Sequence, residues 1–107
     1  MYRVTTPTHT FTLPIETATC SEILVTYKQK KLKLDKHYEN GTTPPGMTLD
    51  GNKVVIRLTQ EETKQFDAAE VAGVQVRVLT LAGDVFASQK FAVFIKDVLN
   101  EEILSDE

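Results

Sequence analysis

The residues that could perform nucleophilic or metal chemistry are few and lie far apart in this sequence. His9 and His37 fall in separate segments, and their spacing to Cys20 matches no zinc-ligand pattern. A nucleophilic cysteine needs a nearby base and an electropositive setting. The neighbours of Cys20 are two hydroxyl residues and a glutamate, which provide neither. We therefore predict structural roles for both histidines and for Cys20.

Acidic residues offer two further candidates for chemistry. Glu61 and Glu62 are adjacent, and adjacent helical residues project about 100° apart, so they do not form a catalytic carboxylate pair. Asp50 and Asn52 could contribute to a calcium site, but with Gly51 they are interpreted as a turn. The five glycines occur singly and form no phosphate-binding loop. The sequence thus predicts no catalytic residue, no cofactor and no metal, and we expect a protein that is not an enzyme.

Composition narrows the classes of partner and the compartment. The 107 residues carry a formal net charge of −3, which disfavours nucleic-acid binding, because that binding depends on neutralising phosphates. No apolar run is long enough to span a membrane or to act as a signal peptide, and a lone cysteine favours a reducing cytoplasm. Five lysines crowd one stretch, which we interpret as a solvated strand face, with a phosphate site as the alternative: Lys28, Lys30, Lys31, Lys33 and Lys36.

Apolar and polar side chains alternate along several segments, as in half-buried strands. In the first of these, His9, Phe11 and Leu13 share one face, and three threonines share the other. The same alternation recurs in three further segments. Their predicted inward residues are Ile23, Val25, Tyr27, Val54, Ile56, Leu58, Val74, Val76 and Val78.

Turn and capping signals place the remaining elements. Asp50-Gly51-Asn52 predicts a hairpin between residues 47–49 and 54–58. Thr59 with Glu62 fits a capping box, which predicts one short helical turn near residues 60–66, held by Phe66 in the core. A last strand is expected from about residue 85 to residue 95, with apolar residues on both of its faces.

These elements together predict an all-β fold, an immunoglobulin-like antiparallel β-sandwich of about seven strands, with an up-and-down barrel as the alternative. The sandwich is expected to cover residues 1–99, and residues 100–107 to form an acidic, frayed tail. Flat threonine-rich strand faces and open edges suit pairing with another chain. The predicted interaction surface combines one face of the first strand with the outward side of the last: Thr8, Thr10, Thr12, Phe86, Ala92 and Phe94.

Several segments carry a family resemblance. The chain resembles small proteins that are encoded in the structural regions of prophages in Gram-positive bacteria. The resemblance is carried by the stretches 10–14, 23–27, 54–63, 74–78 and 83–88. The chain is more loosely similar to the immunoglobulin-like N-terminal domain of phage baseplate upper proteins. The resemblance covers roughly residues 8–98 and supplies strand and turn patterns, with no catalytic residue to carry over. It implies a virion or tail-assembly accessory protein, made in the bacterial cytoplasm, with the virion as a further location.

Two hypotheses for a binding function follow. In the first, the chain is a non-catalytic module that contacts phage structural proteins or other copies of itself, without nucleic acid or membrane. In the second, the same scaffold binds carbohydrate or a host surface. Sugar sites usually stack aromatic rings, and the chain has no tryptophan and only three tyrosines.

Overall fold

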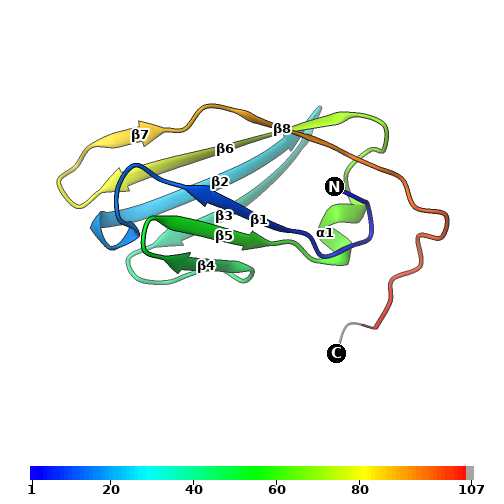
Figure 1. Cartoon of the computed structure of the whole chain (residues 1–107), viewed down its shortest axis with the longest axis horizontal. Coiled ribbons are helices and arrows are strands. Elements are labelled where there is room, and N and C mark those ends of the chain that lie inside the picture. The colour runs from blue at the N-terminus through cyan, green and yellow to red at the C-terminus, as the bar shows by residue number, and fades with distance from the viewer. Residues whose placement is uncertain (106–107) are drawn as a thin grey trace.

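Two antiparallel sheets face each other in the computed structural model, which describes residues 1–105 (Figure 1). The smaller sheet has the order β1-β5-β4. The larger sheet has the order β3-β2-β6, with both β7 and β8 pairing along the far edge of β6. The strands are β1 (Thr8–Thr12), β2 (Cys20–Gln29), β3 (Leu32–Glu39), β4 (Met47–Asp50), β5 (Lys53–Arg57), β6 (Val71–Thr80), β7 (Val85–Ala87) and β8 (Phe91–Phe94).

The predicted all-β sandwich is confirmed, with two separate sheets in place of a closed barrel. Residues 1–105 contain eight strands where about seven were expected, because the last predicted strand is divided into β7 and β8. One detail differs from the constant-type immunoglobulin order, in which the second strand pairs within the sheet of the first and fifth. Here β2 lies in the larger sheet, between β3 and β6.

The core lies between the inner faces of the two sheets. All nine inward positions predicted from the alternation in β2, β5 and β6 and their flanks are buried. The predicted hairpin is also confirmed. β4 and β5 pair with each other, and Asp50 and Lys53 are the pair next to the turn, in which Gly51 has a φ of +58°. The period of two therefore selects the buried side of each strand.

The helical turn forms where the capping box predicts it. Helix α1 (Gln60–Lys64) begins after Thr59, whose hydroxyl accepts a hydrogen bond from the Glu62 amide at 3.1 Å. Glu62 in turn accepts from the Thr59 amide at 2.9 Å. Phe66 follows the helix into the core, where its ring meets that of Tyr27 edge-on. A second short element, a 3-10 turn (η1, Thr17–Thr19), precedes β2.

One lysine of the basic stretch does not fit the predicted solvated face. Lys36 occupies an inward position of β3, opposite Val25, and is 9% exposed. Its ammonium lies 2.6 Å from a carboxylate oxygen of Glu62 and 3.3 Å from the carbonyl oxygen of Pro45. A lysine is accommodated there because its charge has a partner, so the solvated interpretation was wrong for Lys36.

The prediction of one continuous last strand was also wrong. β7 pairs Phe86 with Val78, whereas β8 pairs Phe91 with Val74, so one extra residue is inserted between the two registers. At the break, the Ser88 amide donates to Val76 and the Ser88 hydroxyl accepts from the Val76 amide. Such an insertion reverses the side-chain parity along the strand.

The described part of the acidic tail contains no helix or strand and runs from β8 past α1 (Figure 1). The side-chain amide of Gln60 donates to the Leu104 carbonyl at 2.8 Å and accepts from the Leu104 amide at 2.9 Å. Residues 106 and 107, the end of the predicted tail, lie outside the described residues. Within residues 1–105, no helix is long and apolar enough to cross a membrane.

Candidate functional site

The side of the sandwich between β1 and β8 is open. A groove of about 530 Å³ runs along it, with β1 on one wall and with Val74, Phe91 and Val93 of the larger sheet on the other. Among the described residues, β1 pairs only with β5 and β8 only with β6, so each strand presents an edge to this side. We call this feature the edge groove, defined by residues 8–12, Val74, Phe91 and Val93.

Aromatic and apolar side chains form the floor of the edge groove. The ring of Phe11 lies 5.7 Å from that of Phe91, and His9 contacts Tyr27 through a hydrogen bond of 2.6 Å between Nδ1 and the phenol oxygen. Burial, together with the nearby N-terminal ammonium, holds the pKa of His9 below its ordinary value. Burial and the charge of Glu62 raise the pKa of Tyr27. This hydrogen bond anchors His9, whose side chain lines the groove above the buried Tyr27.

The backbone of β1 presents unpaired hydrogen-bonding groups to the edge groove. The Leu13 amide donates to Asn52, and the Leu58 amide donates to Pro7, so the odd-numbered residues of β1 face β5. Because successive backbone groups of a strand alternate in direction, the amides and carbonyls of the even-numbered threonines point to the open side. Such groups are ready to pair with an added strand.

The free edge of β8 is shorter. The N-terminal ammonium of Met1 donates to the Phe94 carbonyl at 2.7 Å, and the Lys96 amide donates to the Met1 carbonyl at 2.7 Å. The first residues of the chain therefore cover the end of β8, and its uncovered part lies before Phe94.

The structure brings together only part of the predicted interaction surface. Thr8, Thr10 and Thr12 are exposed side by side along the rim of the edge groove. Phe86 is 49% exposed, but the break at Ser88 turns it toward the inner side, with Val78. Ala92 and Phe94 pair with Gly73 and Val71 and face outward from the larger sheet, so they do not share a face with Phe86.

Sequence reasoning did not include Phe91 and Val93 in the predicted interaction surface, because they share the face of the last strand opposite to that of Ala92 and Phe94. Both do face inward, but Phe91 is 38% exposed and Val93 is half-buried, because the smaller sheet ends at β1 and does not cover them. The alternation along the strand was the available signal for the face on which Phe91 and Val93 lie. Alternation does not show whether another sheet covers that face.

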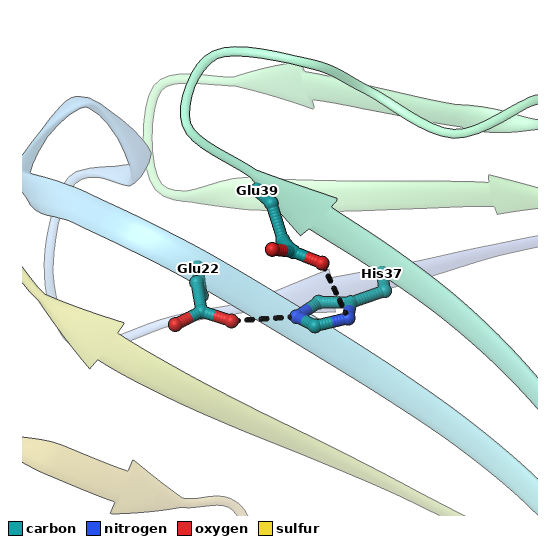
Figure 2. A group of neighbouring side chains, drawn as sticks. All are labelled: Glu22, His37 and Glu39. Atoms are coloured by element: carbon teal, nitrogen blue, oxygen red, sulfur yellow. Dashed lines mark hydrogen bonds and ion pairs between the residues drawn. The ribbon is translucent and has the colours of Figure 1, made fainter.

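A second group of side chains lies on the outer face of the larger sheet (Figure 2). His37 lies between two glutamates, with Nε2 at 2.8 Å from Glu22 and Nδ1 at 3.3 Å from Glu39. Glu22 and Glu39 are directly opposite each other across β2 and β3, and two such carboxylates repel. One imidazole and two carboxylates are donors that zinc accepts. The arrangement also holds together without a metal, since each ring nitrogen of His37 faces one of the two carboxylates.

The same outer face carries a shallow basic groove of about 470 Å³. It lies over Gly73 and is bordered by Lys28, Lys30, Arg77 and Lys90. Lys30 is engaged by two acids, at 3.4 Å from Asp67 and 3.0 Å from Glu70. Lys28 is solvent-exposed, as the solvated interpretation of the lysine stretch predicts.

The predicted structural residues are not brought together into a reactive site. Cys20 is 4% exposed, its thiol is 3.8 Å from the carbonyl oxygen of Glu16, and burial raises its pKa. His37 contacts acids on the outer face, and His9 contacts Tyr27 on the inner side. A thiol with a raised pKa is a poor nucleophile.

Comparison with known proteins adds no relative. No protein-family model, no curated protein and no solved structure matches this chain.

Proposed function

We propose that this chain is a non-catalytic accessory module of a phage or prophage virion or tail, which acts through contacts with phage structural proteins or with other copies of itself. The phage setting rests on the sequence resemblance of residues 8–98. It implies synthesis in the bacterial cytoplasm and incorporation into the virion. The mode of action is supported by the edge groove.

The observation that carries the proposal is the combination of unpaired backbone and uncovered aromatic surface on one side of the sandwich. Isolated exposed apolar residues are ordinary, but contiguous ones beside a free strand edge are typical of protein-contact sites. Phe91 is 38% exposed at the wall of the groove, next to the outward-pointing backbone groups of Thr10 and Thr12. A partner chain can satisfy both features at once.

Co-expression tests the proposal directly. The chain, tagged at the C-terminus, is produced together with each capsid, portal, tail and baseplate protein encoded beside it, and complexes are measured by light scattering after size-exclusion chromatography. The chain alone is measured at rising concentration in parallel. Association with a virion protein, or concentration-dependent self-association, is the expected result. A strict monomer that joins none of these proteins would contradict the proposal.

The carbohydrate alternative is separated from this proposal by a glycan array. Binding to defined glycans without any protein association would replace the proposed function with that alternative.

A further inference from the structure

The two sheets differ in width by one strand position. The larger sheet is four positions wide, because β7 and β8 succeed each other beside β6, whereas the smaller sheet has three strands. Phe11 of β1 reaches Phe91 of β8, and His9 reaches Tyr27 of β2, so β1 lies above β6. The position above β7 and β8, next to the free edge of β1, holds no strand among the described residues.

We infer that this vacant position receives an extended strand from a partner protein, which pairs with β1 and covers the inner side of β7 and β8. The inference rests on the proposed function and names the chemistry of the partner segment. Its backbone pairs with the open groups of Thr8, Thr10 and Thr12, as in strand addition to a sheet edge. Its inward residues are apolar, because they meet Phe91 and Val93.

The opposite side of the sandwich shows what a closed side looks like in this fold. There β3 and β4 are the edge strands, and the inward-pointing Lys36 lies between the sheets with Glu62 and Pro45 as its partners. An inward-pointing charge at a sheet edge prevents pairing with a further chain. At the corresponding inward place the β1 side has His9, hydrogen-bonded to Tyr27, together with Phe11 and Phe91, and among the described residues no lysine or acid lies there to oppose pairing.

Charge favours an acidic or neutral outer side on the added strand. Arg57 pairs with Thr8 and Lys53 pairs with Thr12, so cations flank β1 on the outer face of the smaller sheet. Neither of these two cations forms an ion pair within residues 1–105. Acidic side chains on the outer side of the partner strand would complement them.

A second copy of this chain does not fit the position through its own β1. A twofold axis between two β1 strands would join the smaller sheets into one continuous sheet. Each larger sheet extends one position beyond β1, so β8 of one copy would then occupy the place of β6 of the other. A single extended segment avoids this overlap.

The test uses a synthetic peptide of about nine residues, long enough for a typical strand. Valine and isoleucine alternate in it with threonine and glutamate, and binding is followed by fluorescence anisotropy. Two controls are matched to it: a scrambled peptide of equal composition, and a peptide with the same side chains in which alternate backbone amides are N-methylated. The first removes the alternation and the second removes the pairing groups. We expect binding by the alternating peptide alone.

Matched protein variants locate the site. Thr10→Pro removes an amide that points to the groove without breaking the pairing with β5, and Lys33→Pro makes the same change at the free edge of β3. Phe91→Thr removes the apolar wall, and Phe94→Thr makes the same change on the outer face. Thr10→Pro and Phe91→Thr should each weaken binding at least about tenfold, equivalent to about 1.4 kcal/mol. The two controls should bind within about twofold, which corresponds to about 0.4 kcal/mol.

The outcomes separate this inference from the proposed function. The inference is overturned if the alternating peptide does not bind, if the N-methylated peptide binds equally well, or if Phe94→Thr and not Phe91→Thr abolishes binding. It is also overturned if a virion partner found by co-expression binds the Thr10→Pro and Phe91→Thr variants as tightly as the natural chain; in that case the proposed function stands. If light scattering shows that the natural chain forms a dimer and that the Thr10→Pro and Phe91→Thr variants do not, a second copy occupies the groove and the partner strand is again excluded. Circular dichroism and thermal unfolding confirm that each variant is folded.

Discussion

Replacing Lys36 with methionine tests whether its ion pair with Glu62 holds the β3–β4 side of the sandwich together. The Lys36 ammonium lies 2.6 Å from Oε2 of Glu62, and the two side chains are only 11% and 16% exposed. Methionine keeps the length and the apolar stem of lysine but leaves the carboxylate without its cation. We expect a lower free energy of unfolding, because a partly desolvated charge then lacks its partner.

The size of the effect follows from the burial of the pair. Removing one partner of a buried ion pair costs about 3–5 kcal/mol, whereas an exposed pair contributes about 1 kcal/mol or less. Glu62 retains the hydrogen bonds from Thr59 in either case. We therefore expect Lys36→Met to lower the free energy of unfolding by about 2 kcal/mol, which corresponds to a Tm lowered by roughly 8–16 °C.

The assay is a double-mutant cycle by urea unfolding. Glu62→Gln removes the charge but keeps an acceptor for the capping box. The cycle compares the natural chain, each single variant and the double variant. The free energy of unfolding of the double variant should be at least about 1 kcal/mol higher than the value obtained by adding the losses of the two single variants. Strict additivity, or a loss below about 0.5 kcal/mol for Lys36→Met, would refute the view that this pair closes the side.

Acid provides an independent check on the same pair. Burial alone raises the pKa of Glu62, but the hydrogen bonds from Lys36 and Thr59 and the charge of Lys36 outweigh it and hold the pKa below its ordinary value of 4.5. The resulting stability is present above pH 4.5 and is lost as the pH falls through the lowered pKa. Glu62→Gln should show a weaker loss over that range than the natural chain. An identical acid profile would contradict this assignment.

Three further predictions concern single residues. Gly46→Ala should cost more than about 2 kcal/mol in urea unfolding, because φ is +83° and a Cβ would lie 2.4 Å from the Arg57 carbonyl oxygen. Gly83→Ala, with φ +92° but no atom nearby, should cost only about 1 kcal/mol, and equal losses would count against the steric argument. The imidazole of His9 should titrate below pH 6.5 when followed by NMR, and a midpoint at or above 6.5 would contradict this. The contribution of His9 to the free energy of unfolding should be complete above pH 6.5 and decline as the pH falls toward its lowered pKa. Cys20 should react with a thiol reagent only on unfolding, and rapid labelling of the native chain would show that it is not buried.

Much of the fold could be predicted because alternation is a local signal. The inward residues of β2, β5 and β6 follow from a period of two, and the capping box of Thr59 and Glu62 follows from residue types at a spacing of three. The hairpin turn at Gly51 is local in the same sense. None of these predictions required knowledge of which strands are neighbours.

The candidate site could not be predicted because it depends on pairing between distant strands. Glu39 is two residues from His37 on the same face of β3, but Glu22 meets the two of them only through the register of β2 against β3. The inserted residue near Ser88 shifts the register of β7 on β6 relative to that of β8, and so places Phe86 on the inner side. The sequence alone predicts the same face for Phe86 and Ala92, because six residues separate them and no insertion is visible. Sheet width, which leaves Phe91 uncovered, is a property of the assembled sandwich.

The two sides of the sandwich that carry edge strands solve the same physical problem in different ways. An edge strand with free backbone groups either carries a feature that discourages pairing or is left able to pair. On the β3–β4 side, the charge of Lys36 is placed between the sheets and held by Glu62. On the β1–β8 side, the inward residues are His9, Phe11 and Phe91, and the residues with open backbone groups are threonines, which favour strands. A sequence that protects one edge with a buried charge and leaves the other apolar is one in which the unprotected edge is available for a partner.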